Sequence, residues 1–373
     1  MTPRSCTSQS PGHSRIGATQ SGSTAEASPH TERVNVAALE DEIKAEERIR
    51  ELEAACVTLQ RQLSKAKGKT SDLVDAVERA AKDAAIVTGI PKAAAPPKKR
   101  KASKHDDEVC LVHLTDWQLG KVSESYSTEV CIERIRTVVE RVRRITRVQR
   151  ADHPVRHCVV MLGGDHVEGN GIFPGQTHEV DSTSYAQLFA ATNLMVETIL
   201  SLLEDFETVE VYSVPGNHGR LGRKGDEARE TNLDNIAYGF ARMQLANQSR
   251  LVWHDHGHWY QHVVIGKYQA LLVHGDQVKS FGGTPAFAIA RKATAWSSGA
   301  IPVSFTDLFI GHFHQNLVVT LPNSGQVRMT PATESNSQYA SEFMASKGRP
   351  GQRCLFVHPE RGVVTGEYMI WLD

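Results

Sequence analysis

Five short apolar runs in this chain each end in a cluster of polar residues, and this repeated pattern limits the fold more than any other feature. The runs are Val109–Leu114, Cys158–Leu162, Val209–Val214, Gln269–Val273 and Asp307–Ile310. Apolar runs of this length, bounded by glycine and polar residues, are typical of buried strands. Because the loops that leave the strand ends of a sheet collect its chemistry, we expect the five polar clusters to lie together.

The rest of the C-terminal part fits the same sheet-based fold. Two amphipathic stretches, Glu129–Val148 and Tyr185–Leu203, lie between the first three runs and are predicted to be helices. Later strand-like segments are Trp259–Ile265, Leu317–Leu321, Gln326–Thr330, Arg353–Val357 and Gly362–Trp371. Strands alternating with helices, followed mainly by strands, predict an α/β fold over residues 108–373, a two-sheet sandwich with helices outside it (α/β/β/α).

The N-terminal third has a different composition. Residues 1–33 are rich in Ser, Thr, Gly and Pro and are predicted to be a disordered tail. Residues 34–90 are predicted to form a helical arm of coiled-coil type, because apolar residues recur three and four apart at Ile49, Leu52, Cys56, Leu59 and Leu63. The helix at 36–66 either pairs with a second copy or a partner protein, or folds back on its own domain.

A linker follows the predicted arm. Residues 91–107 are rich in Pro and Ala and carry a basic run, Lys98–Lys104. A basic run of this kind can contact DNA phosphates, and it can equally serve as a solubilising tether.

Composition excludes several classes of protein. The 373 residues are 40% apolar and 23% charged, which is typical of a soluble globular protein. The net charge of −1 means that any affinity for nucleic acid has to come from local patches. No apolar run approaches the roughly 18 residues of a membrane span, and the N-terminus lacks the apolar stretch of a signal peptide. The six cysteines form no CxxC pair, so we expect reduced thiols and a cytoplasmic protein.

The polar clusters contain the residue types that hold a pair of divalent cations. They are Asp116-Trp117-Gln118, Gly163-Gly164-Asp165, Asn217-His218, His274-Gly275-Asp276 and Gly311-His312-Phe313-His314. Two cations about 3.5–4 Å apart can clamp a phosphate and stabilise both its attacking and departing oxygens. One carboxylate has to be shared between them, and Asp165 is the predicted bridge. Taken singly, each aspartate also fits a turn cap and each histidine a core position.

In this order the clusters resemble the calcineurin-like metallophosphoesterase superfamily, whose pattern is D-x-H, GD, GNH, H and GHxH; the resemblance covers roughly residues 109–320. It implies one cation held by Asp116, Gln118, Asp165 and His314, and a second held by Asp165, Asn217, His274 and His312. It also implies that His218 donates a proton to the leaving oxygen. Gln118 departs from the pattern, which has His there. A Gln oxygen suits Mn²⁺ or Mg²⁺ better than Zn²⁺, so Mn²⁺ is the expected metal, with Mg²⁺, Zn²⁺ or Fe as alternatives.

Neighbouring residues give further candidates for the site. Arg220, Glu168 and His166 are candidate substrate-binding or supporting groups, and Arg220 can equally face solvent. The polar loop Asn170–Asp181 is expected to wall the site. Three histidines in the stretch Trp253–Trp259 could bind another metal, although such a stretch is more often an exposed strand beside a loop.

The loop Asn170–Asp181 and the Glu-Gly-Asn-Gly stretch at 168–171 that leads into it are similar to phage and bacterial members of this superfamily that are described as DNA repair exonucleases, the SbcD-like branch. In that branch the partner-binding helices follow the catalytic domain, whereas here the predicted helices precede it. The GDxVDRG and GNHE motifs of the phosphoprotein phosphatases are absent.

Three functions therefore remain open. The first is a Mn²⁺-dependent DNA nuclease, an exonuclease or endonuclease, in the cytoplasm of a bacterial or phage-infected cell. The second is a phosphodiesterase or phosphatase acting on small nucleotides. The third is a catalytically degenerate scaffold that assembles through the N-terminal helix.

Overall fold

The computed structural model describes residues 91–97, 106–172, 175–222, 225, 231–254, 258–279, 285–334 and 348–373, together with Lys44 and Arg48. The predicted tail 1–33, the rest of the predicted arm 34–90 and the basic run Lys98–Lys104 lie outside these residues. The chain divides into the units Met1–Ser64 and Lys65–Asp373, and every element described below belongs to the second unit.

The elements alternate between strand and helix at first and are mostly strands afterwards. In chain order they are β1 (Glu108–Leu114), α2 (Thr128–Gln149), β2 (Val155–Leu162), η1 (Gln176–His178), α3 (Ser184–Asp205), β3 (Thr208–Ser213), α4 (Leu233–Gln244), β4 (Leu251–Trp253), β5 (Tyr260–Ile265), β6 (Tyr268–Val273), α5 (Ala286–Ala295), η3 (Trp296–Ala300), β7 (Asp307–Ile310), β8 (Leu317–Thr320), β9 (Gln326–Met329), β10 (Gly351–His358) and β11 (Val363–Trp371).

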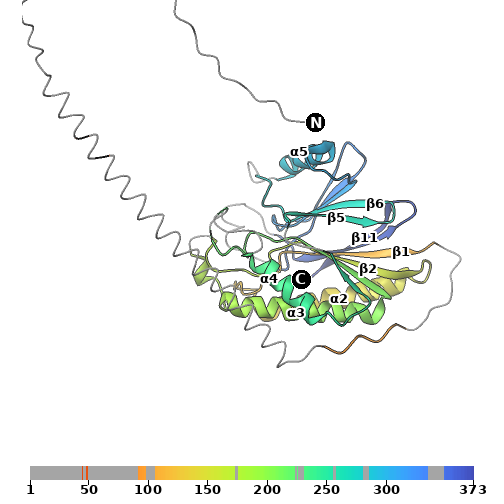
Figure 1. Ribbon diagram of the computed structural model, residues 1–373, viewed down its shortest axis with the longest axis horizontal. Coiled ribbons are helices and arrows are strands. Elements are labelled where there is room, and N and C mark those ends of the chain that lie inside the picture. Colours follow the sequence, from red (N-terminus) through yellow and green to blue (C-terminus); the bar gives the residue numbers. More distant parts are fainter. Residues whose placement is uncertain are drawn as a thin grey trace, which may run out of the picture. The chain divides into compact units, whose positions relative to one another are not determined.

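The strands form two sheets (Figure 1). The six-stranded sheet has the order β11-β10-β1-β2-β3-β4, in which β1 to β4 are parallel. The five-stranded sheet has the order β5-β6-β7-β9-β8, and β6, β7 and β9 are parallel. The carboxyl ends of the parallel strands in each sheet therefore lie along one edge of that sheet.

Strand β1 shows how the sequence builds the layers. Its side chains are buried on both faces, as expected for a central parallel strand. Val109 and Leu111 join the core between the two sheets, whereas Cys110 and Val112 join the core beneath helices α2, α3 and α4. A third apolar cluster packs α5 against the outer face of the five-stranded sheet. The predicted two-sheet α/β sandwich with helices outside is confirmed (Figure 1).

All ten predicted strands and both predicted helices are present, within three residues at each end. The chain also forms α4, α5 and the short strand β4, which the sequence analysis did not predict. Helix α4 starts at an Asn232 cap whose side chain accepts from the N–H of Asp234. This is a helix-start signal that the polar sequence before it conceals.

The first seven residues of the predicted linker bind to the domain. The Ala94 N–H donates to Gln248 Oε1 at 2.8 Å, and the Arg250 guanidinium donates to the carbonyls of Ala94 and Ala95. Asn247 donates to the carbonyl of Pro91. Residues 91–97 therefore lie along the turn between α4 and β4.

Helix α3 is, among the described residues, the only helix long and apolar enough to cross a membrane by length and composition. Within the fold it contributes eight buried apolar residues to the core against the six-stranded sheet, including Leu188, Ile199 and Leu202. Its apolar character is therefore explained by packing.

Candidate metal centre

The candidate ligands stand on unusual backbone. Among the described residues, six non-glycine residues have positive φ, and five of them are candidate ligands: Asp116 (52°), Gln118 (46°), Asp165 (53°), His312 (66°) and His314 (54°). Side chains with a Cβ rarely adopt this left-handed conformation, and such strain concentrates at functional sites.

The site loops are tied directly to one another, both between the two sheets and within the six-stranded sheet. The His312 N–H, after β7, lies 3.0 Å from Asp116 Oδ2, after β1. The His218 N–H, after β3, donates to Asp165 Oδ1 at 2.7 Å. At Gly216 an added Cβ would lie 2.0 Å from Asp165 Oδ1, so the close approach of the two loops requires glycine.

Three candidate ligands, Asn217, His274 and His312, gather around Asp165. His274 Nε2 lies 3.0 Å from Asp165 Oδ2 and 3.1 Å from Asn217 Oδ1. The ligand atoms of Asp165, His274 and His312 lie within 4.8 Å of one another. The His274 Nδ1 lies 2.8 Å from the Gly163 carbonyl, which can only accept, so Nδ1 carries a proton and Nε2 is the nitrogen that would bind a cation.

A second group of candidate ligands adjoins the first. His314 Nε2 lies 3.3 Å from Asp116 Oδ1, and Gln118 Nε2 lies 3.5 Å from His314 Nε2. The structure thus brings together all seven predicted ligands at one edge of the sandwich. Two carboxylates, three imidazoles and two amides are a donor set that fits two divalent cations such as Mn²⁺, Mg²⁺ or Zn²⁺. The assignment of individual ligands to two ions remains a prediction.

His218 lies beside these ligands with its two ring nitrogens in different surroundings. Its Nδ1 lies 3.1 Å from Glu168 Oε2 and 3.0 Å from the Glu168 carbonyl. Its Nε2 lies 3.4 Å from Gln118 Nε2 and 4.0 Å from Asp165 Oδ2. Burial opposes the charged ring, but the Glu168 and Asp165 carboxylates raise the pKa of His218 to about 9. Glu168 therefore holds a proton on His218 while Nε2 faces the candidate ligands.

The buried carboxylates and imidazoles of the centre shift one another's pKa strongly. Burial would lower the pKa of His274, but the Asp165 carboxylate raises it to about 10. Burial likewise opposes the charge on His314, whose contacts with Asp116 and Glu334 raise its pKa to about 10. The His274 charge in turn holds the pKa of Asp165 well below its usual range against the effect of burial.

Two residues that the sequence analysis missed support His314. Glu334 Oε1 lies 3.1 Å from His314 Nδ1, and its Oε2 lies 2.7 Å from Lys121 Nζ. All of these groups except His314 are almost fully buried. Burial would raise the pKa of Glu334, but its contacts with His314 and Lys121 lower it to about 2. Glu334 follows β9 just as the other site residues follow their strands, and this position was the available signal.

Asp234 was also missed, although it organises two of the site loops. Its carboxylate accepts from the N–H groups of Asp165 at 2.9 Å, His166 at 3.0 Å and Gly216 at 2.8 Å. It is fully buried in the first turn of α4. Because α4 was not predicted, no sequence signal placed this aspartate beneath the centre.

The remaining predicted residues occupy different positions. His166 is fully buried, and its ring packs against Trp117 and Tyr238, whose hydroxyl bonds its Nδ1. His166 is therefore a core histidine, and its fully buried side chain is not in a position to contact a substrate. Arg220 forms an ion pair with Asp276 at 2.9 Å and is partly exposed.

The histidine-rich stretch Trp253–Trp259 is described only in part, since residues 255–257 are not described. His254 stacks on Tyr212 with ring centroids 3.9 Å apart, and its Nε2 lies 3.0 Å from Glu210 Oε2. His254 is thus accounted for by a ring stack and an ion pair.

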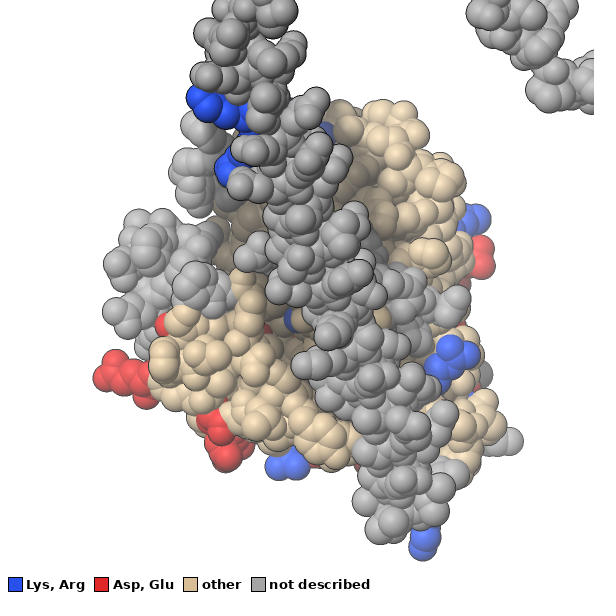
Figure 2. Space-filling view, turned by 60° about the vertical axis from the view of Figure 1, so that its left-hand side comes forward, with Lys and Arg blue, Asp and Glu red and all other residues tan. Residues whose placement is uncertain are grey.

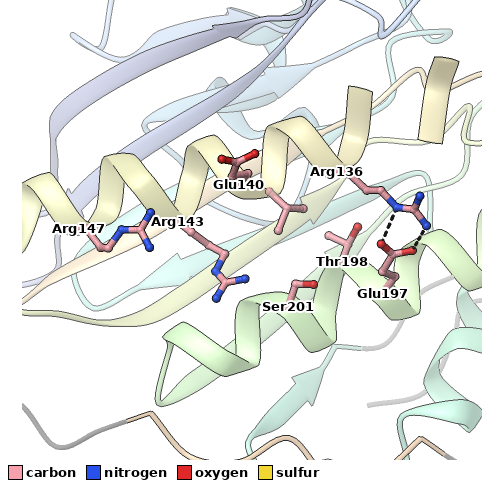
Figure 3. Close-up of a pocket in the computed structure, with 8 residues that line it drawn as sticks. Arg136, Glu140, Arg143, Arg147, Glu197, Thr198 and Ser201 are labelled. Carbon is pink, nitrogen blue, oxygen red and sulfur yellow. Dashed lines mark hydrogen bonds and ion pairs between the residues drawn. The ribbon is translucent and has the colours of Figure 1, made fainter. Parts of the chain in front are cut away.

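A hollow of about 420 Å³ lies elsewhere, between α2 and α3 (Figure 3). Arg136, Arg143 and Arg147 line it, together with Glu197. Arg136 is held in a two-bond pair by Glu197, at 2.7 and 2.9 Å, and Arg143 by acidic residues at the end of α3. Since two of the three arginines are already neutralised, the hollow is explained by helix packing.

Fold and site together define a class: two-sheet α/β sandwiches that gather carboxylates, imidazoles and amides at the carboxyl ends of strands from both sheets. No family model and no curated protein matches the chain.

Among solved structures, similar chains include Vps29 complexed with Zn²⁺ from Entamoeba histolytica, with 13% identity over 71% of this chain and 99% of that one, and a TM-score of 0.32. A dimetal phosphatase from Danio rerio has 12% identity over 71% and 99%, with a TM-score of 0.38. A purple acid phosphatase from yellow lupin has 12% identity over 74% and 56%, with a TM-score of 0.33.

Proposed function

We propose that this protein binds two divalent cations and hydrolyses phosphoesters, as the resemblance to the calcineurin-like metallophosphoesterases implies. The observation that carries this proposal is the convergence of seven candidate ligands from loops of both sheets, five of them on left-handed backbone. Turn caps and core histidines have no requirement to lie near one another. Their convergence at one place therefore favours a shared role in binding cations.

The residues have distinct parts in such a reaction. When bound, the two cations supply a nucleophile at neutral pH and neutralise charge on the phosphoryl oxygens. Asp116, Asp165, Asn217 and the three histidines His274, His312 and His314 would hold the cations. His218 donates a proton from Nε2 to the leaving oxygen, and Glu168 orients the ring through Nδ1.

The test is a substrate panel assayed in parallel with Mn²⁺, Mg²⁺ and Zn²⁺. The panel contains a nitrophenyl phosphomonoester, a bis-nitrophenyl phosphodiester, cyclic nucleotides, and single- and double-stranded DNA. We expect metal-dependent turnover of at least one phosphoester by the wild-type protein and none by the Asp165→Asn variant. Absence of turnover throughout the panel, in a protein that also binds fewer than two cations per chain, would favour the scaffold.

For the substrate, we propose DNA and a nuclease activity with Mn²⁺ as the natural metal. The basic run Lys98–Lys104 and the SbcD-like likeness of the loop Asn170–Asp181 support this choice. On the face drawn in Figure 2, the described lysines and arginines are scattered and do not form one continuous patch. The basic run would add a concentrated set of positive charges that can contact phosphates.

Deletion of residues 98–105 tests the DNA proposal. A protein that loses these residues should cleave DNA more weakly, and its cleavage should fall less steeply as salt concentration rises, because fewer counterions are released on binding. Turnover of the small diester should be unchanged. If DNA cleavage is equally unchanged at all salt concentrations, small nucleotides become the favoured substrates.

We further propose that the protein acts in the cytoplasm of a bacterial or phage-infected cell and pairs through the helix at 36–66. The apolar spacing from Ile49 to Leu63 supports pairing. Sedimentation of the full chain beside a chain starting at residue 91 tests it: only the full chain should form dimers.

A further inference from the structure

Gln118 lies at the centre of a buried polar network formed with Lys121, His218 and His314. Its amide nitrogen lies 3.4 Å from His218 Nε2 and 3.5 Å from His314 Nε2. Its amide oxygen lies 3.4 Å from Lys121 Nζ. The Gln118 side chain is 1% exposed, and the His218 and His314 rings beside it are partly exposed.

Lys121 determines which end of the Gln118 amide faces the site. An ammonium group only donates hydrogen bonds, so the atom beside it has to be the amide oxygen. The reversed amide would set its NH₂ group against the ammonium. The Gln118 amide nitrogen is therefore the atom that faces the Nε2 atoms of His218 and His314.

Lys121 is itself fixed by the buried carboxylate of Glu334. Their ion pair measures 2.7 Å, and the two side chains are 8% and 4% exposed. The second oxygen of Glu334 lies 3.1 Å from His314 Nδ1. One buried ion pair thus sets both the Gln118 amide and the His314 ring.

Resting on the proposed function, we propose that Gln118 binds the phosphoryl group as a hydrogen-bond donor, and that Lys121 and Glu334 are the residues that position it. This role replaces the ligand role that the resemblance implies for Gln118. With the His314 Nε2 lone pair taken by a cation, the Gln118 amide hydrogens remain as donors. Phosphoryl oxygens only accept, so a donor held at this point matches them.

The first test separates a donor from a ligand through binding rather than turnover. Gln118→Met removes both amide atoms at similar size, and Gln244→Met on α4 is the matched control. Equilibrium dialysis counts bound Mn²⁺, and calorimetry measures the binding of inorganic phosphate to the Mn²⁺-loaded proteins. We expect an unchanged Mn²⁺ count and affinity, and phosphate binding weakened about 10- to 100-fold, the usual range for one hydrogen bond to a charged group.

The second test leaves Gln118 in place and removes the pair that orients it. The Lys121→Met/Glu334→Gln double variant removes both charges, so no buried charge is left unpaired, and its new amide oxygen can still accept from His314. Lys267→Met/Glu360→Gln is the matched control at an exposed ion pair. We expect the double variant to keep its Mn²⁺ and to lose phosphate affinity, with the control unchanged.

The outcomes are distinguishable from those of the proposed function. A wild-type protein that binds no Mn²⁺ overturns both. If the wild type binds Mn²⁺ but no phosphate, if Gln118→Met loses Mn²⁺, or if phosphate binding is the same in wild type and both variants, this inference alone is overturned. For a variant that does not fold, as judged by its thermal transition, the other variant decides.

Discussion

At the scale of single residues, the centre depends on side chains that leave the backbone at strained turns. Asp116, Asp165 and His314 all have φ between 52° and 54°, and each follows a buried strand without room for a longer loop. The strain is retained because the loops are fixed on both sides by hydrogen bonds, such as that from the His218 N–H to Asp165.

Replacement of the predicted bridge should separate metal binding from folding. Asp165→Asn keeps the size and one acceptor oxygen of the side chain but removes the charge that two cations would share. We expect elemental analysis to find fewer than two cations per chain and an activity loss of at least about 100-fold, in the range of a lost electrostatic contact at an active site. Two tightly bound ions in the variant would show that Asp165 does not bridge.

Replacement of His218 should affect proton transfer and leave the metals in place. His218→Asn should lower kcat about 10²- to 10⁴-fold, the usual contribution of a general acid. The loss should be smaller for a nitrophenyl ester, whose leaving group needs no proton, than for an alkyl ester. Equal losses for both esters, or loss of bound metal, would contradict this role.

At the scale of the elements, helix α4 holds the site loops from below. The Asp234 carboxylate accepts three backbone N–H groups from two loops. Asp234→Ala leaves these donors unpaired in the interior, at roughly 1–3 kcal/mol for each buried group. We expect the free energy of unfolding in urea to fall by several kcal/mol, whereas Asp152→Ala at an exposed position should change it by less than about 0.5 kcal/mol. A loss as small as that of the control would show that the loops are held by other contacts.

The elements also show what sequence patterns can predict. The strands were predictable because their apolar runs are continuous and end abruptly in polar residues, as in Asp307–Ile310 before Gly311. Helix α4 was not, because its start lies in a polar stretch and its buried face includes Asp234 and Asn235. Polar side chains on this buried face bond to the site loops, while the apolar ones pack in the core. The face therefore lacks the regular apolar spacing by which a helix is predicted.

The candidate ligands were predictable for the same reason as the strands, whereas their supporting residues were not. A polar residue that follows a buried strand can be recognised in the sequence because it comes directly after an apolar run, as Asp165 and His274 do. Lys121 and Glu334 meet only through the fold, and 213 positions of chain separate them. The burial of their ion pair has no signature in either local sequence.

At the scale of the whole molecule, the two sheets are joined at the centre as well as through their common core. His274 leaves one sheet and donates to the Gly163 carbonyl of the other at 2.8 Å, and His312 is tied to Asp116 in the same way. The stability of the sandwich should therefore depend on the charges at its edge.

The metal-free protein should lose stability as pH rises above neutral. His274 and His314 have folded-state pKa values raised to about 10 by their carboxylate partners, above the unfolded value near 6.5. A raised pKa contributes stability that is fully present below about pH 6.5 and is lost as pH rises toward 10. Urea unfolding of EDTA-treated protein at pH 7, 8 and 9.5 measures this, and a stability that is constant or rises over that range would contradict it.

Anomalous diffraction from crystals grown with Mn²⁺ shows directly whether residues from both sheets hold a pair of cations. We expect two Mn²⁺ peaks at the edge of the sandwich, with Asp165 touching both and His274, His312 and Asn217 around one of them. A single peak away from Asp165, or no peak within reach of these side chains, would contradict it.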